Sequence, residues 1–337
     1  MMKIKFGFIV LILLPLAAWG QDGMIQYTNH VHSILMSLAG KKVPHQLALG
    51  TTQFIAVHGH HARVQMGSMV MLFNLQKQEV SWLNPVQKTY TKLPIAHLFA
   101  MLHQALAKVE APKPSAGQAA LKNMRIHTEL SRIAAHPARI LGIPVIERKL
   151  MMTMAMPLPA RPGTPAPPAA MASGLDMRMV MRFWFARQDA VAAHPALASL
   201  ERISRASARL FDPTSLLAGL PGLPPEFTQI THIYAQLAKQ QTVMLRMQMK
   251  FYSPMLTMLL PMILQREHKP LPAGFDPNGP IMSMTSSATK LSSRPLPAAL
   301  FQIPAGYHAV AFPPQKLPGF SSPKPPASAA HGMLEKS

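Results

Sequence analysis

The sequence predicts an α+β protein built on a strongly curved antiparallel β-sheet, half-barrel-like, with two or three helices packed against it. Three observations predict this class. Many segments alternate between apolar and polar residues and are separated by short turns. A few other segments carry apolar residues at helical spacing. Hydrophobic residues make up 49% of the 337 residues, which is enough for one substantial core.

Three of the predicted strands share an unusual feature, which is methionine at every second residue. Because alternate side chains of a strand point to the same face, each run places a row of flexible thioethers on one side of the sheet. The runs are Met152-Thr153-Met154-Ala155-Met156, Met177-Arg178-Met179-Val180-Met181 and Met244-Leu245-Arg246-Met247-Gln248-Met249, the last with the period of two at Met247 and Met249.

The N-terminal half contains a series of predicted strands. Residues 24–28 begin the series, 52–58 alternate well, 62–75 continue as one long strand pattern, and 79–83 and 88–93 form a hairpin around Asn84-Pro85. Pro94 is suited to the first turn of a helix whose apolar stripe includes Leu98, Leu102 and Leu106. Residues 111–117 are rich in Pro, Gly and Ser and indicate a linker.

The C-terminal half contains a second set of predicted strands together with further helices. Strand patterns occupy 124–130, 139–141, 145–156, 176–187, 242–252 and 281–291, and helical patterns occupy 195–211 and 226–239. The apolar run 255–264 fits either a strand or a short helix, and it is too short to cross a membrane. Residues 296–307 close the fold.

The first twenty residues have the pattern of a secretory signal peptide. Lys3 and Lys5 precede an apolar run over 6–18, and the small residues Ala18 and Gly20 stand before Gln21. The sequence therefore predicts cleavage near Gly20 and a periplasmic or secreted location, with a retained N-terminal anchor as the alternative. Residues 21–312 then form a single domain with a Pro/Ala-rich insertion at 157–173, and 313–337 form a disordered tail.

The charge balance is strongly basic, with 33 Lys and Arg against 13 Asp and Glu. This excess favours anionic partners such as a membrane surface. The basic residues are spread singly and accompany no nucleic-acid motif, which argues against a nucleic-acid partner. One predicted helix concentrates them at Arg202, Arg205 and Arg209, a face that suits either anionic head groups or water.

The order of the predicted elements resembles a group of exported, uncharacterised bacterial β-rich proteins over roughly residues 24–310. Four motifs carry the resemblance: a Tyr-Thr hairpin at 84–91, a Gly-centred strand pair at 140–145, a Trp-bearing strand at 182–186, and a closing motif at 300–307 that reads Leu-Phe-Gln-Ile-Pro-Ala-Gly-Tyr. The order is also similar, more loosely, to the lipoprotein-carrier fold of the LolA, LolB and LppX type. That resemblance implies a curved sheet whose concave face, lidded by helices, holds acyl chains.

Catalytic chemistry finds no support in the sequence. The acidic residues are scattered, no nucleophile, zinc-protease or phosphate-loop motif occurs, and the absence of cysteine excludes thiolate chemistry and disulfides. We therefore predict a protein that is not an enzyme and needs no cofactor. The dense cluster of His58, His60 and His61 suits a metal site or a solvated turn, and no carboxylate lies close in sequence to complete a zinc site.

The methionine runs allow three interpretations: Cu(I) ligands, a pliable surface for hydrophobic ligands, or ordinary core filling in a structural domain without a ligand. Their Leu, Phe and Val neighbours at strand spacing favour a buried apolar surface over an exposed metal site. We predict a hydrophobic, lipid-like ligand. The residues expected to line its site are Met152, Met154, Met156, Met177, Met179, Met181, Phe183, Met247, Met249 and Phe251.

Overall fold

The computed structural model describes residues 22–34, 51–98, 100–101, 125–133, 138–155, 176–210, 233, 243–266, 268, 270–272 and 275–311. The predicted signal peptide, the 157–173 insertion, the 313–337 tail and Met156 lie outside these residues, as does most of the predicted helix at 226–239.

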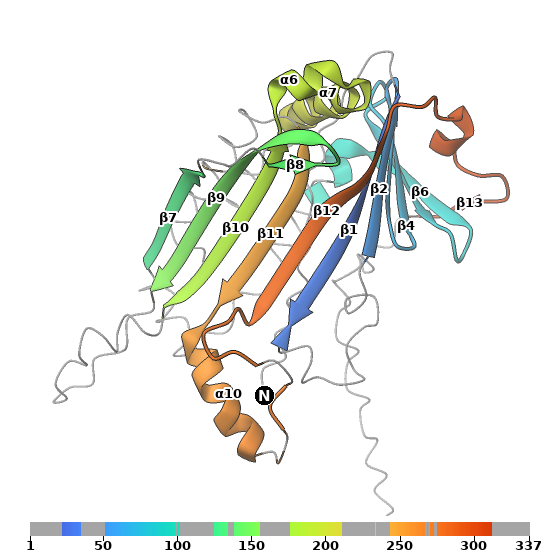
Figure 1. Cartoon of the computed structure of the whole chain (residues 1–337). Coiled ribbons are helices and arrows are strands. Elements are labelled where there is room, and N and C mark those ends of the chain that lie inside the picture. The colour runs from blue at the N-terminus through green and yellow to red at the C-terminus, as the bar shows by residue number, and fades with distance from the viewer. Residues whose placement is uncertain are drawn as a thin grey trace, which may run out of the picture.

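The described chain is β-rich and forms one large, curved and unclosed sheet with few helices (Figure 1). The strand order is β13-β6-β5-β4-β3-β2-β1-β12-β11-β10-β9-β7, with β8 paired to β9 outside this path. Neighbouring strands are antiparallel, except that β13 runs parallel to β6. The strands are β1 (Gly23–Ser33), β2 (Thr51–His58), β3 (His61–Met66), β4 (Met69–Asn74), β5 (Glu79–Asn84), β6 (Thr89–Pro94), β7 (Arg125–Arg132), β8 (Arg139–Ile140), β9 (Ile143–Ala155), β10 (Met177–Ala186), β11 (Met244–Tyr252), β12 (Met282–Ser292) and β13 (His308–Ala309).

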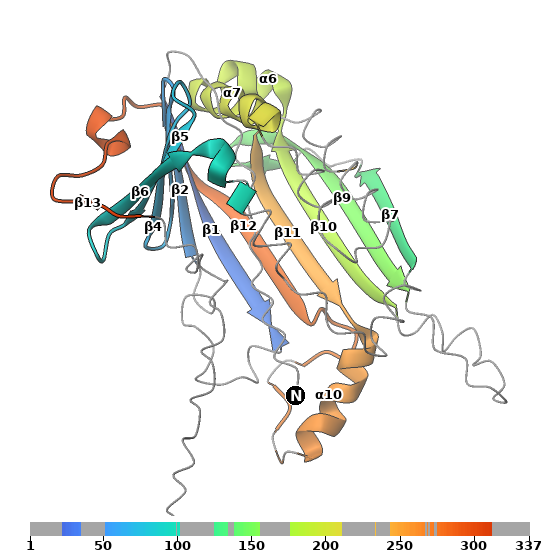
Figure 2. The same cartoon turned by 180° about the vertical axis from the view of Figure 1, so that it is seen from behind.

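The first strand, β1, joins the two halves of the sheet. It pairs with β2 of the N-terminal meander on one side and with β12 of the C-terminal strands on the other. The N-terminal strands turn away from the plane of the C-terminal strands, so the sheet bends along β1 and β2 (Figures 1 and 2). A sheet of this width curls because each pair of neighbouring strands adds right-handed twist.

Helices lie at opposite ends of the C-terminal strands (Figure 2). At one end are α6 (Gln188–Ala193) and α7 (Pro195–Leu210), which follow β10 directly. At the other end is α10 (Pro254–Arg266), which follows β11. A short 3₁₀ helix, η2 (Ala298–Phe301), precedes β13. No helix among the described residues is long and apolar enough to cross a membrane.

The main core joins α6 and α7 to the sheet. Leu197 and Leu200 of α7 pack with Ile25 and Tyr27 of β1 and with Leu245 of β11. The contact between β1 and α7 is close at Gly23, where an added Cβ atom would lie 2.9 Å from the carbonyl oxygen of Ala196. A side chain at this position would push the helix from the strand, so glycine is required there by packing.

The closing motif packs against the outer side of the N-terminal strands. Ile303 and Tyr307 contact a cluster of Val70, Leu72 and Leu83. The hydroxyl of Thr91 donates a hydrogen bond to the carbonyl oxygen of Val310 (3.0 Å), and β13 extends this edge of the sheet. The motif is therefore a structural element in this chain.

Most predicted elements are present, and the structure corrects or completes the remaining expectations. The pattern at 62–75 is two strands, β3 and β4, because Gly67 adopts a positive φ of 55° in a tight turn between them. The ambiguous run at 255–264 is helical. The short helix α6 was not predicted. Residues 95–98 and 100–101 are helical, so the predicted helix begins after Pro94, which ends β6.

Candidate functional site

The predicted methionine strands β9, β10 and β11 are direct neighbours, and their registers align the thioethers. Met181 of β10 pairs with Leu150 of β9 on one side and with Met249 of β11 on the other. Two residues earlier in β10, Met179 pairs with Met152 of β9 and with Phe251 of β11. Paired residues of a sheet point to the same face, so the runs combine into one apolar surface.

This surface extends beyond the three predicted strands. A central row crosses six strands in the order Leu130 (β7), Leu150 (β9), Met181 (β10), Met249 (β11), Met284 (β12) and Val31 (β1). We call the surface the methionine face and define it by this row and its neighbours on the same side of the sheet. Those neighbours are Met152, Met154, Met177, Met179, Phe183, Met247, Phe251 and Met282.

Nine of the ten residues predicted to line a ligand site lie on the methionine face, and Met156 lies outside the described residues. Their burial differs along the strands. Met152, Met181, Phe183, Met247 and Met249 are buried, whereas Met154, Met177, Met179 and Phe251 are half-buried. The half-buried residues lie toward the end of β10 that is remote from α6 and α7.

The sequence reasoning missed the contribution of β12 and of Leu150. Met284 and Leu150 are both buried members of the cluster, and Met282 packs against it. The signal was present for β12, because Met282 and Met284 also alternate. Leu150 could have been found by extending the alternation of Met152 and Met154 backwards by one step.

Two polar features border the apolar cluster on the same face. Ser286, the partner of Met247 on β12, is 1% exposed, and its Oγ has no hydrogen-bond partner among the described residues. On the other side of Met247 lies its β10 partner Phe183, which pairs in turn with Arg148 of β9. Arg148 and Arg132 of β7 are direct cross-strand partners. Burial lowers the pKa of Arg148, and the positive charge of Arg132 lowers it further.

The opposite face of the same strands is polar and basic, as the alternation of β10 predicts. Arg178 lies over the ring of Tyr252 at 4.7 Å, and Arg246 lies over the ring of Trp184 at 5.2 Å. Arg182 Nε lies 3.5 Å from Glu147 Oε1. The strands are therefore amphipathic, with cation–π pairs on one side and thioethers on the other.

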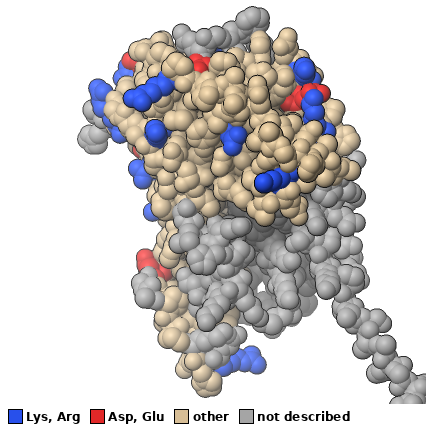
Figure 3. Space-filling view, turned by 90° about the vertical axis from the view of Figure 1, so that its right-hand side faces the viewer, with Lys and Arg blue, Asp and Glu red and all other residues tan. Residues whose placement is uncertain are grey.

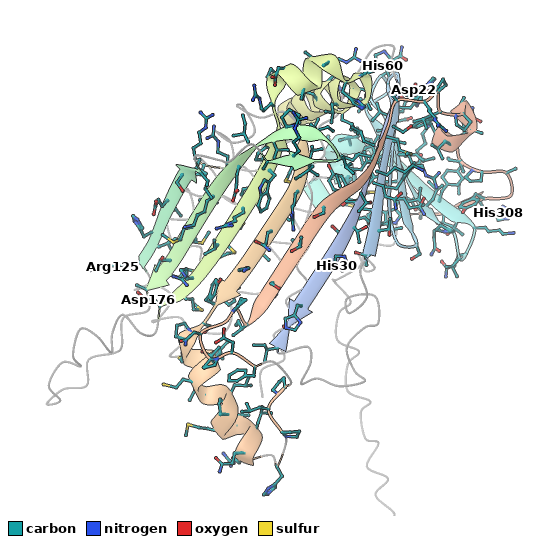
Figure 4. The ribbon with its side chains drawn as sticks, viewed as in Figure 1. Asp22, His30, His60, Arg125, Asp176 and His308 are labelled. Carbon is teal, nitrogen blue, oxygen red and sulfur yellow. The ribbon has the colours of Figure 1, made fainter. Side chains whose placement is uncertain are left out.

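The histidine cluster lies at the turn between β2 and β3, and the tertiary structure brings a carboxylate to it. Asp22 Oδ1 lies 2.6 Å from Nδ1 of His58, although 36 residues separate the two in sequence. Asp22 and His60 lie near the same end of the molecule in Figure 4. The sequence offered no nearby carboxylate, so this pair corrects that expectation. No group of three or more His, Asp or Glu among the described residues is arranged to hold a metal.

His58 and Asp22 instead join the start of the described chain to the segment around η2 near its end. The His58 ring stacks on Phe301 of the closing motif with 5.7 Å between ring centroids. The second carboxylate oxygen of Asp22 accepts a hydrogen bond from the backbone N–H of Leu296. Burial lowers the pKa of the adjacent His61, and positive charge on His58, His60 and Lys77 lowers it further.

The basic face predicted on α7 is only partly described. Arg202 is half-buried, and its Nε donates a hydrogen bond to the carbonyl oxygen of Ala198 at 3.3 Å. The side chains of Arg205 and Arg209 lie outside the described residues. On the side of the molecule shown in Figure 3, Lys and Arg side chains are scattered singly, with few acidic side chains between them.

Comparison with known proteins gives no family for this chain. No protein-family model matches the sequence, and no curated protein sequence is significantly similar to it.

Proposed function

We propose that this chain is an exported, non-catalytic protein that binds a hydrophobic, lipid-like ligand on the methionine face. One observation carries the proposal: four neighbouring strands, β9 to β12, each place methionines on the same face of an unclosed sheet. The six-strand row through Met181 and Met249 is apolar from Leu130 to Val31, and a long acyl chain could lie along it.

Methionine suits such a role because its side chain is unbranched and its sulfur is polarizable. Thioethers adjust to apolar partners of different shapes at small cost, which is why methionine is frequent on binding surfaces that accept many ligands. A core built only for stability would favour Leu, Ile and Val, whose rotamers are better defined. The main core around α7 has that composition, with Ile25, Ile55, Val57, Leu197 and Leu245.

The described structure supports a covered position for the ligand. Ile233 packs against the buried methionine cluster, so this residue lies over the face. In the proposed complex, the acyl chain lies between the sheet and Ile233. The half-barrel form with helices over its concave face, as in the lipoprotein-carrier fold, is part of this proposal. The Ser286 hydroxyl, which has no hydrogen-bond partner among the described residues, would meet a polar group of the ligand.

Native mass spectrometry of the gently purified protein tests the proposal directly. We expect adducts in the mass range of lipids, which organic extraction should release. Protein freed of lipid should take up added long-chain fatty acid. Gentle purification that recovers no lipid, followed by no uptake of fatty acid, would refute the binding function.

Paired substitutions on β10 locate the site. Met179→Lys places a charge on the methionine face, whereas Val180→Lys places the same charge on the opposite face of the same strand, and both positions are half-buried. Desolvating a lysine beside an acyl chain is costly, so Met179→Lys should weaken fatty-acid uptake by about tenfold or more. Val180→Lys should leave uptake unchanged. Equal losses in both variants would place the ligand elsewhere.

Export has its own test. Expression with the native N-terminus in a Gram-negative host, followed by fractionation and N-terminal sequencing, should yield a periplasmic or secreted protein that begins at Gln21. Recovery of the uncleaved chain in the membrane fraction would support the N-terminal anchor.

A further inference from the structure

The helix α10 is apolar on two opposite sides. Thr257, Leu260 and Leu264 form its buried side, and the two leucines pack with Ile34 and Phe275. The other side carries Met258, Leu259, Met262 and Ile263. Met258 and Met262 are each 65% exposed, Ile263 is 49% exposed and Leu259 is 36% exposed. Four large apolar side chains at adjacent helical positions thus form one exposed patch.

A hydrogen bond caps the N-terminus of α10, and its buried leucines attach it to the rest of the protein, so the exposed patch has a defined position. Pro254 occupies the first turn, and the buried Ser253 accepts a hydrogen bond at Oγ from the N–H of Leu256 (3.4 Å). The Thr257 hydroxyl donates to the carbonyl oxygen of Pro254 at 3.0 Å. With one side held by Leu260 and Leu264, the exposed residues are presented outward. In Figure 4, sulfur-bearing side chains project outward from α10, below the sheet.

The location of α10 links it to the methionine face. Only Ser253 separates the end of β11 at Tyr252 from the start of the helix at Pro254. The strand that carries Met247, Met249 and Phe251 therefore leads into α10. It lies at the end of the sheet remote from α6 and α7 (Figures 1 and 2). The half-buried methionines Met154, Met177 and Met179 lie at this same end of β9 and β10.

We propose that α10 is a membrane-docking helix whose exposed side enters the interface of an anionic lipid bilayer. At 13 residues it is about 20 Å long, too short to cross a bilayer but sufficient to lie in its surface. It contains no acidic residue, and Arg266 stands in its last turn. Long basic side chains beside an apolar helix face are typical of interfacial helices.

Charge favours a bilayer over a second copy of the chain as the occupant of this patch. The chain carries a formal net charge of +20, so two copies repel each other while an anionic surface attracts the protein. A negatively charged leaflet attracts each Lys or Arg held close to it. The charge would bring the protein to the surface, and the four apolar side chains would hold it there.

The absence of cysteine allows a site-specific test on the whole mature chain. Met262→Cys introduces the sole thiol, which is labelled with an environment-sensitive fluorophore. Adding vesicles of equimolar phosphatidylglycerol and phosphatidylcholine should shift the emission to the blue, as expected for a label entering the interface. The matched control is Val86→Cys, at an 83% exposed apolar position in the β5–β6 turn, where the label should not respond.

Co-sedimentation with the same vesicles measures the contribution of the patch. The double variant Met258→Asp, Met262→Asp should bind about tenfold or more weakly, because a carboxylate in the interface loses hydration and meets like charge. Val86→Asp should bind like the unmodified chain. Vesicles of phosphatidylcholine alone should bind the unmodified chain more weakly than the anionic vesicles.

Three outcomes would overturn the proposal. The first is an unchanged emission of the fluorophore on the Met262→Cys variant when anionic vesicles are added. The second is a double variant that binds anionic vesicles as strongly as the unmodified chain, which would show that basic residues elsewhere hold the protein on the vesicles. The third is a dimer of the unmodified chain by light scattering that becomes a monomer in the double variant, which would assign the patch to a second copy.

The proposal stands apart from the ligand site. A double variant that loses vesicle binding yet keeps its extractable lipid would support α10 as the docking element. Vesicle binding through α10 by a protein that takes up no fatty acid would retain the membrane role and refute only the ligand.

Discussion

Met181 of β10 and Met249 of β11 are direct cross-strand partners at the centre of the methionine face, and both are buried. They lie between Leu150 on one side and Met284 on the other. The pair comes from two segments that lie far apart in the sequence, and only the register of β10 and β11 brings them together. Their packing is therefore the most direct measure of how the face contributes to stability.

Truncation of Met249 should destabilise the protein. Met249→Ala removes a buried side chain and leaves a cavity, so the free energy of unfolding should fall by about 2–4 kcal/mol, whereas Met249→Leu should cost less than about 1.5 kcal/mol. Urea unfolding followed by circular dichroism measures both. Met258→Ala on the exposed side of α10 serves as the control and should stay within about 0.5 kcal/mol of the unmodified protein. A cost for Met249→Ala below that of the control would contradict the buried position.

Tyr27 fixes β1 to β11 through a buried hydrogen bond. Its hydroxyl donates to the carbonyl oxygen of Met244 at 2.6 Å, and burial raises the pKa of the hydroxyl well above its ordinary value. Tyr27→Phe leaves that carbonyl without this donor and should lower the free energy of unfolding by about 1–2 kcal/mol. The measurement is again urea unfolding. Tyr252→Phe, which keeps the ring under Arg178, is the control and should have little effect.

Removal of the Ser286 hydroxyl should stabilise the protein. The Oγ atom is buried without a hydrogen-bond partner among the described residues, and such an atom carries a desolvation cost. Ser286→Ala should therefore raise the free energy of unfolding of lipid-free protein by about 1 kcal/mol. Ser287→Ala, on the opposite face of the same strand, is the matched control. Should Ser286→Ala prove clearly destabilising, the hydroxyl must have a bonding partner.

The Asp22 carboxylate should hold the closing segment in place. It contacts His58 at 2.6 Å and accepts the N–H of Leu296. Asp22→Ala should lower the free energy of unfolding by about 1–2 kcal/mol and accelerate hydrogen exchange at the Leu296 amide. Asp189→Ala, which removes an exposed ion pair with Arg187, is the control and should leave protection of the Leu296 amide unchanged. Unaltered protection of the Leu296 amide in Asp22→Ala would show that the segment is held by other contacts.

His61 should make stability fall in mild acid. Its pKa in the folded protein lies below the value near 6.5 of the unfolded chain. Between those two pKa values the unfolded chain binds more protons, so this contribution is fully present above about pH 6.5 and declines as the pH falls toward the folded pKa. His61→Gln should therefore lose less stability than the unmodified protein between about pH 7.5 and 5.5 in urea unfolding. Lys77→Gln, which removes one neighbouring positive charge, should reduce the loss in part. If all three proteins lost the same stability over this pH range, the lowered pKa of His61 would be contradicted.

Several parts of the structure followed from local residue patterns. Alternation in 176–187 and 242–252 predicted β10 and β11 and the two faces of each strand, because the period of two in a strand is set by backbone geometry alone. The apolar spacing of 195–211 predicted α7 for the same kind of reason. The turn at Gly67 was missed because apolar residues continue on both sides of Gly67-Ser68, from Val64 and Met66 into the run 69–73.

The tertiary structure decided what these elements face. Strand order and register align Met181 with Met249 and add Leu150 and Met284 to the same row, and neither order nor register is encoded in any one segment. The fold also brings Asp22 to His58 and leaves one side of α10 exposed, because both depend on contacts between residues distant in sequence. The sequence by itself determined which residues could form an apolar face, and the packing of the sheet determined that they form a single one.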